Sequence, residues 1–177
     1  MGNKLDKLTK HNYGSWIPVI AKILHDFGLN VILYRKIVPE ETLMEKYSRL
    51  ENGIFFDENE RYDAKFITPY LKDCVSFLTK KGMLKYQNLS IKKIQQFLDE
   101  EFILIAYLNY FRIYPKEKKE PPSGHMVVLT GYDKTHIYLH ENNPLHSEPN
   151  KKITNNLFLK SWCDNKEFFG NLIVCKS

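Results

Sequence analysis

The residues GHMVVLTGYDKTHIYLHENN, at positions 124–143, determine how the chain folds, because they predict a β-hairpin. Two β-rich runs flank a short polar turn, which is the pattern of two antiparallel strands joined by a tight connection. The first run starts at His125 and the second ends at Glu141. Since the second strand of a hairpin returns along the first, we expect residues 141–143 to come back toward His125.

The segments around the hairpin predict further strands and the helices that cover them. Upstream, Ser90 is placed to cap a helix, and the continuous apolar run 102–108 that follows has the length of a central strand. Downstream, residues 156–162 show helical spacing and residues 170–175 predict a closing strand. Together these elements predict an α+β fold in which helices pack on a mainly antiparallel sheet.

The beginning of the chain predicts a helix, a glycine turn and a strand. Ser15 can cap the helix, Gly28 can end it, and the β-rich run 29–34 follows directly. The apolar face expected for this helix consists of Ile17, Ile20, Ala21, Ile23, Leu24 and Phe27.

Two more helical patterns follow. The first covers residues 39–50. The second begins at Thr68 or Pro69 and runs through Lys80. Cys74 lies on the apolar stripe of this second helix, so we expect it to be a core residue.

Length and composition indicate a single globular domain. With 177 residues, 43% of them hydrophobic, the chain can bury one ordinary core. Its net charge of +5 is scattered along the sequence, unlike the concentrated basic stripe of a nucleic-acid-binding protein. No apolar run approaches the roughly 18 residues of a membrane span, and the first ten residues lack the apolar core of a signal peptide. We therefore expect a cytoplasmic protein that binds neither nucleic acid nor membranes.

The cysteines and histidines limit the metal chemistry that we expect. The three cysteines form neither a CxxC pair nor an even set, which argues against a zinc site and against a disulfide framework. His136 and His140 lie four residues apart on one predicted strand, but no clear third ligand completes a metal site. We expect neither a metal nor another cofactor.

His125 is the candidate catalytic residue. It stands between the proline- and charge-rich stretch 114–124, which predicts an exposed loop, and the first residues of a buried strand. This position fixes an imidazole on rigid backbone and leaves one side open, as a general base for a thiol nucleophile requires. An Asp, Glu or Asn that accepts from the ring would orient it and fix its tautomer. The alternative is a structural histidine beside a polar turn that precedes Pro144.

Four segments resemble the C39-like family of papain-like cysteine peptidases. Residues 124–143 look like the family's pattern of Gly-His, apolar residues, Gly-Tyr-Asp, a turn, and an apolar-Tyr-apolar strand that ends in an acid. SIKKIQQFLDEEFILIAYLN (90–109) resembles the helix and strand before the histidine loop. PNKKITNNLFLKSW (149–162) is similar to the Asn-Lys-Ile segment and the Phe-x-x-x-Trp helix, and GSWIPVIAKILHDFGLNVILY (14–34) to the Trp-bearing helix and the next strand.

The resemblance implies a papain-like fold, one C39-like domain over residues 1–177, and His125 as the catalytic histidine. It implies Glu141 as the orienting acid in the gap-free register, or Asn142 if the turn is shifted by one residue. Members of the family carry their cysteine at the N-terminus of a helix near the start of the domain, where amides and dipole stabilise a thiolate and an oxyanion. No cysteine precedes Gly14, so the sequence predicts that the nucleophile segment is lacking.

Two functions of different classes are compatible with this pattern. In the first, the domain is not catalytic and binds a peptide or a partner protein beside His125. In the second, it is an active cysteine peptidase or amide hydrolase whose cysteine is supplied upstream of Met1 or, with less support, by Cys74. Cys163 and Cys175 follow the histidine in the chain, which is the reverse of the papain order. The pattern predicts neither a substrate nor an oligomeric state.

Overall fold

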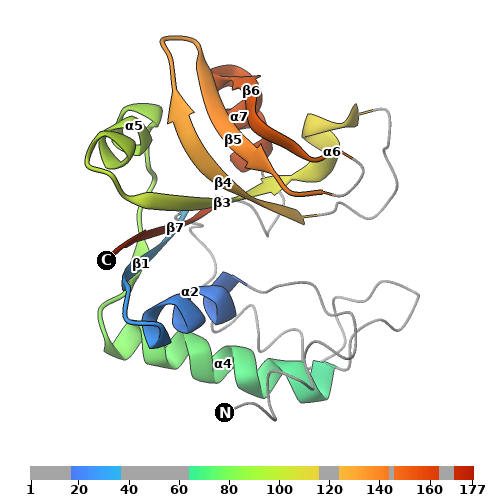
Figure 1. The fold of residues 1–177 in the computed structure, drawn as a ribbon. Coiled ribbons are helices and arrows are strands. Elements are labelled where there is room, and N and C mark those ends of the chain that lie inside the picture. Colours follow the sequence, from blue (N-terminus) through green and yellow to red (C-terminus); the bar gives the residue numbers. More distant parts are fainter. Residues whose placement is uncertain (1–16, 37–63, 116–123, 144–145, 164–169) are drawn as a thin grey trace.

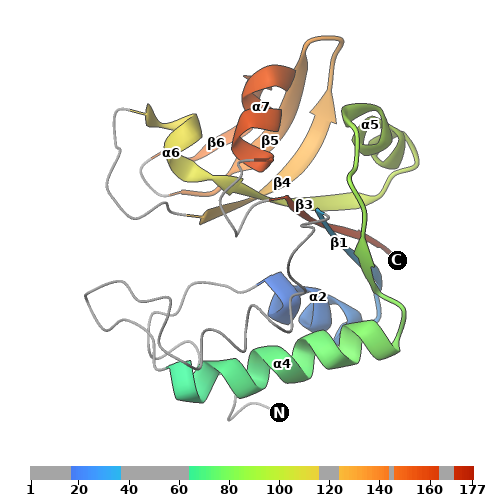
Figure 2. The same ribbon diagram turned by 180° about the vertical axis from the view of Figure 1, so that it is seen from behind.

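The computed structural model describes residues 17–36, 64–115, 124–143, 146–163 and 170–177. In this part of the chain, strands form one sheet and helices lie on both of its faces (Figures 1 and 2). The strands are β1 (Asn30–Arg35), β2 (Leu84–Tyr86), β3 (Ile103–Asn109), β4 (Gly124–Tyr132), β5 (His136–Glu141), β6 (Glu148–Thr154) and β7 (Asn171–Lys176). Their order is β2-β1-β7-β3-β4-β5-β6, and only β1 and β2 pair in parallel. The predicted α+β class with a mainly antiparallel sheet is confirmed.

Helices on the two faces of the sheet create two apolar cores. The helices are α2 (Ile17–Asp26), α4 (Ala64–Lys80), α5 (Ile91–Asp99), α6 (Tyr110–Ile113) and α7 (Asn155–Trp162). α2 and α4 pack together on one face, whereas α5, α6 and α7 lie on the other (Figure 1). Phe158 and Leu139 are buried in the core beneath α7, and Leu78 and Ile173 are buried in the core beneath α2.

Side-chain caps set the boundaries of two predicted helices. Ser90 Oγ accepts a hydrogen bond from the backbone N–H of Lys93 at 3.2 Å and starts α5 as expected. Thr154 Oγ1 accepts from the backbone N–H of Leu157 at 3.1 Å and starts α7 at Asn155, one residue before the predicted range. Such caps satisfy amides that have no partner inside the helix.

α4 is longer than the sequence predicts. It begins at Ala64 instead of Thr68 or Pro69, so that Pro69 lies inside the helix. A proline often marks a helix start, because its missing N–H would have no intrahelical partner in the first turn. In α4, Pro69 lacks the backbone N–H that would donate to the preceding turn, so one intrahelical hydrogen bond is lost. The helix nevertheless begins upstream of Pro69, at Ala64.

The prediction for Phe27 is wrong. Its side chain is 82% exposed and does not lie on the apolar face of α2. The helix ends at Asp26, and the chain turns at Gly28, whose φ is +90°. Ser15 and the helical pattern at 39–50 lie outside the described residues.

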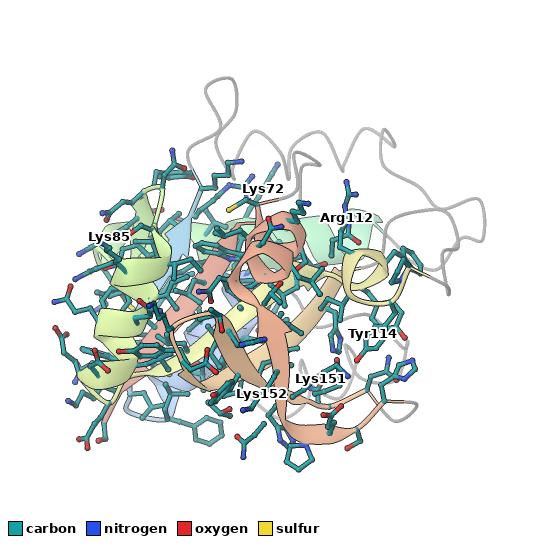
Figure 3. All side chains as sticks on the ribbon, turned by 90° about the horizontal axis from the view of Figure 1, so that it is seen from above. Lys72, Lys85, Arg112, Tyr114, Lys151 and Lys152 are labelled. Carbon is teal, nitrogen blue, oxygen red and sulfur yellow. The ribbon has the colours of Figure 1, made fainter. Side chains whose placement is uncertain are left out.

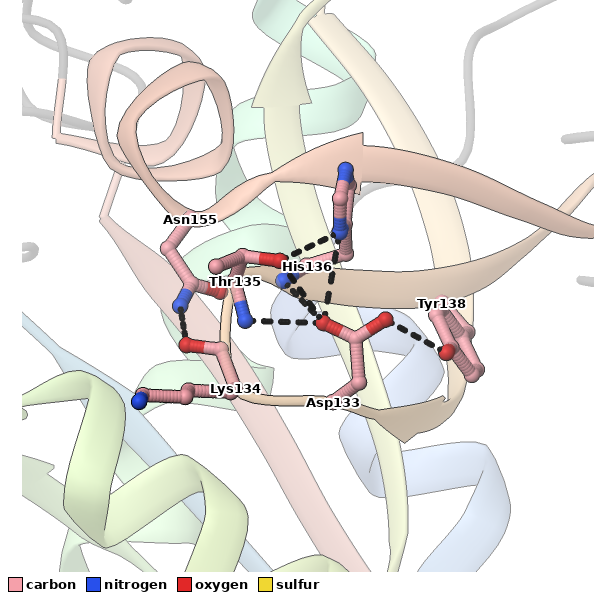
Figure 4. A network of polar contacts seen from close by, with 6 residues as sticks. All are labelled: Asp133, Lys134, Thr135, His136, Tyr138 and Asn155. Atoms are coloured by element: carbon pink, nitrogen blue, oxygen red, sulfur yellow. Dashed lines mark hydrogen bonds and ion pairs between the residues drawn. The ribbon is translucent and has the colours of Figure 1, made fainter.

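The β4–β5 hairpin is confirmed, and an aspartate holds its turn (Figure 4). Asp133 Oδ1 accepts from the backbone N–H groups of Thr135 at 2.7 Å and His136 at 2.8 Å, and Oδ2 accepts from the Tyr138 hydroxyl at 2.7 Å. These donors, the Thr135 amide first, lower the pKa of Asp133. His136 Nδ1 lies 3.2 Å from Asp133 Oδ1, so this histidine contacts the turn at the end of the hairpin away from His125.

Candidate active site

His125 and Glu141 meet at the open end of the β4–β5 hairpin. His125 follows the first residue of β4, and Glu141 is the last residue of β5. Antiparallel pairing brings these two ends together, and His125 Nε2 lies 2.5 Å from Glu141 Oε1. The imidazole side chain is 13% exposed, whereas the carboxylate side chain is fully buried. The expected return of residues 141–143 to His125 therefore takes place through Glu141.

The Glu141 carboxylate has two further donors. The Tyr114 hydroxyl donates to Oε2 at 2.9 Å, and the backbone N–H of Asn143 donates to Oε1 at 2.9 Å. Burial raises the pKa of the carboxyl group, but these donors and the neighbouring imidazole outweigh that effect and hold the pKa of Glu141 below its ordinary value. The carboxylate is therefore ionised at neutral pH.

The lowered pKa of Glu141 makes the stability of the fold depend on pH. The ordinary pKa of a glutamate is 4.5, so below this pH the unfolded chain binds more protons than the native protein. The stability contributed by Glu141 is complete above that pH and is lost as the pH falls through the lower native pKa. In urea titrations from about pH 5 to about pH 3, we expect wild-type protein to lose stability more steeply than Glu141→Gln. Equal slopes would show that Glu141 does not titrate below its ordinary pKa in the native state.

The contact with Glu141 selects one tautomer of the His125 ring. An ionised carboxylate only accepts hydrogen bonds, so the neutral imidazole carries its proton on Nε2 and a lone pair on Nδ1. Among the described residues, none forms a hydrogen bond with Nδ1. Tyr110 packs edge-to-face on the same ring, with 5.6 Å between the centroids. A ring held in this way can take a proton from a thiol, a hydroxyl or a water molecule at Nδ1.

Gly124, the residue before His125, lets the start of β4 pack closely against Tyr107. A Cβ atom built on Gly124 would overlap the ring and hydroxyl of Tyr107, a residue of the neighbouring strand β3. Any side chain here would displace Tyr107 or the start of β4. This steric limit explains why a glycine stands immediately before His125 in the sequence.

An imidazole paired with an ionised carboxylate is a group that can act as a general acid or base. No model of a known family matches the sequence. No curated protein matches it either. The functional argument therefore depends on the residues of the site and their geometry.

Cys74 lies far from this chemistry. It is a buried residue of α4, 1% exposed, and α4 lies with α2 on the face of the sheet opposite to α6 and α7 (Figure 2). Burial raises the pKa of its thiol to about 11. A Cys74–His125 pair would require α4 to leave its interface with α2, so the structure disfavours Cys74 as the nucleophile.

The other two cysteines also lack an activating environment. Cys175 is buried in β7 on the α2 side, and its thiol donates to the carbonyl of Ile103. Cys163 lies at the C-terminal end of α7, the end of a helix that disfavours a thiolate. Burial raises the pKa of both thiols, whereas a histidine-activated cysteine has a lowered pKa.

The other polar side chains predicted near the site are not part of the His125–Glu141 contact. The side chain of Asn142 is exposed, and Asn143 takes part through its backbone N–H. His140 is exposed on β5. Within the described ranges, no three metal-ligating side chains cluster together, and no helix is long and apolar enough to cross a membrane.

Tyr114 is the site residue that the sequence does not predict. The residue lies just after α6, inside the stretch expected to be a loop, and its ring stacks on His146 with 4.1 Å between centroids and 14° between planes. Lys151 approaches the same ring from β6, with Nζ 5.3 Å from its centroid (Figure 3). A lone tyrosine in a charged, proline-rich segment carries no periodic signal that would reveal this position.

Proposed function

We propose that this chain is a C39-like domain with a papain-like fold, in which His125 and Glu141 form the acid–base half of an acyl-transfer site. With its own three cysteines, the domain binds a peptide or protein partner and does not cleave it. The observation that carries this proposal is the fully buried Glu141 carboxylate, held at 2.5 Å from His125 Nε2. A buried charge of this kind adds little net stability, and such groups concentrate at functional sites.

The second candidate is an active cysteine peptidase or amide hydrolase that receives its thiol from outside the three cysteines of this chain. The inferred tautomer of His125 favours it. With its proton on Nε2, the neutral ring has a lone pair on Nδ1, and this nitrogen would take the thiol proton. The thiolate would then attack a carbonyl carbon, and the imidazolium would return the proton to the leaving amine.

Chemical rescue with an external thiol tests the acid–base half directly. The full chain is mixed with p-nitrophenyl acetate and excess 2-mercaptoethanol, and release of p-nitrophenolate is followed at neutral pH. A positioned general base contributes about 10²- to 10⁴-fold. Because the external thiol is not positioned, we expect wild-type protein to accelerate thiolysis by only about tenfold over His125→Ala. Equal rates for these two proteins would overturn the proposed role of His125.

His136→Ala is the matched control for this assay. His136 also has a carboxylate partner, Asp133, but it is the first residue of β5, beside the hairpin turn, and its side chain is 35% exposed. Its loss should leave the rate unchanged. A similar decrease in both histidine variants would mean that any imidazole beside a carboxylate on this protein catalyses the reaction.

Peptide binding is tested with a fluorescein-labelled pool of random hexapeptides. We expect a saturable rise in fluorescence polarisation that weakens in Glu141→Ala, because this substitution releases the ring beside which the peptide would lie. Polarisation that stays at the level of free peptide would overturn the binding function.

A further inference from the structure

We propose that Tyr114 is a positioning residue of this site: its hydroxyl fixes the Glu141 carboxylate, and the carboxylate in turn holds His125 in the Nε2–H tautomer. This inference rests on the proposed function, since it concerns the same imidazole. It adds a residue from a segment 27 positions before Glu141 in the chain.

The two oxygens of Glu141 have separate partners. Oε1 faces the imidazole at 2.5 Å and accepts from the backbone N–H of Asn143, whereas Oε2 accepts from the Tyr114 hydroxyl at 2.9 Å. The imidazole contact alone would leave the carboxylate able to rotate about its last bond. With a donor on each oxygen, the plane of the carboxylate is fixed, and so is the direction from which Oε1 faces Nε2.

The ring of Tyr114 is itself held in place. It stacks on His146 at 4.1 Å, lies 4.9 Å from the ring of Tyr110, and has the ammonium group of Lys151 at 5.3 Å from its centroid. Tyr110 contacts the His125 ring as well, so these aromatic rings surround the imidazole–carboxylate pair. Burial, followed by the contact with Glu141, raises the pKa of the Tyr114 hydroxyl, which therefore stays a donor at neutral and mildly alkaline pH.

Substitution by phenylalanine separates the hydroxyl from the ring. Tyr114→Phe keeps the stacking on His146 and the packing on Tyr110, and it removes only the donor to Glu141. Tyr132→Phe is the matched control, because Tyr132 on β4 likewise donates to a carboxylate, that of Asp99, at 2.8 and 2.9 Å. A role of Tyr114 in packing alone predicts the same behaviour for both variants.

The experiment measures the tautomer of His125 in the full chain labelled with ¹⁵N-histidine. Long-range ¹H–¹⁵N spectra at a pH where the ring is neutral give the protonation of each ring nitrogen, and His125→Ala assigns the signal. We expect only the Nε2–H form in wild-type protein and in Tyr132→Phe. In Tyr114→Phe we expect His125 to lose its exclusive Nε2–H form, so that the ¹⁵N shifts move toward those of a mixture of the two tautomers.

The outcomes separate this inference from the proposed function. If wild-type protein already shows a mixture, the contact between His125 and Glu141 on which both proposals depend is absent. If Tyr114→Phe stays locked like wild-type protein, Tyr114 is not a positioning residue, while the proposed function stands. If Tyr114→Phe does not fold, Tyr114→Met replaces it, since methionine also lacks a donor and adapts its shape to the site.

Discussion

Replacement of Glu141 by alanine is expected to lower the free energy of unfolding by about 3 kcal/mol. The carboxylate is fully buried, faces His125, and accepts from Tyr114 and from the N–H of Asn143. Alanine leaves these part-buried donors without their shared acceptor, and a buried polar group without a partner costs about 1 to 3 kcal/mol. Urea unfolding followed by circular dichroism at pH 7 measures the change.

Glu148→Ala is the control for this substitution. Glu148 and Lys151 both lie on β6, the strand next to β5, and form an ion pair at 2.9 Å. The side chain of Glu148 is 54% exposed. Exposed pairs contribute about 0 to 1 kcal/mol, so we expect a change below that limit. An equally small loss for both variants would contradict the description of Glu141 as a buried acceptor with several donors.

Phe158→Ala is expected to cost about 3 to 5 kcal/mol, the range for removal of a large aromatic side chain from a core. Phe158 is fully buried between α7 and the sheet, and its ring stacks with that of Trp162 at 5.6 Å. Thermal or urea unfolding measures the loss. Because α7 also contacts α6, the substitution is expected to loosen the position of Tyr114 as well.

Phe27→Ala removes the same side chain from the surface. Phe27 is 82% exposed, so the change should stay within about 0.5 kcal/mol. If Phe158→Ala were as mild as Phe27→Ala, the core beneath α7 would not be packed as the structure describes.

Much of the fold follows from local patterns in the sequence. β3, β4, β5 and β7 each contain a run of apolar residues, and the structure confirms a strand at each of them. β6 gives no such signal, because it contains Pro149, a left-handed Asn150 and only one buried residue, Ile153. It lies at the edge of the sheet, where one side needs no partner.

The order of the strands depends on contacts that local patterns do not encode. The predicted closing strand, β7, lies between β1 and β3, in the middle of the sheet. It pairs with residues far away in the chain, such as Tyr34 with Leu172. Hydrophobic periodicity identifies such a strand but does not choose its neighbours.

The site shows the same division. His125 and Glu141 belong to one hairpin, so their proximity follows from the turn between them. Tyr114 lies outside the hairpin, just after α6, and it reaches Glu141 only because β3, α6 and the hairpin fold together. The hairpin pattern therefore predicted that residues 141–143 return to His125, whereas no pattern in the sequence pointed to Tyr114.

We expect that His125 activates none of the three cysteines of this chain. Labelling of the native protein with iodoacetamide at neutral pH is the direct test of this expectation. Mass spectrometry gives the rate for each cysteine, and His125→Ala serves as the comparison. We predict slow labelling of Cys74, Cys163 and Cys175, at rates that His125→Ala does not change, because burial raises the pKa of all three thiols. Rapid labelling of one cysteine that slows in His125→Ala would contradict the account, since it would reveal a histidine-activated thiolate within the chain.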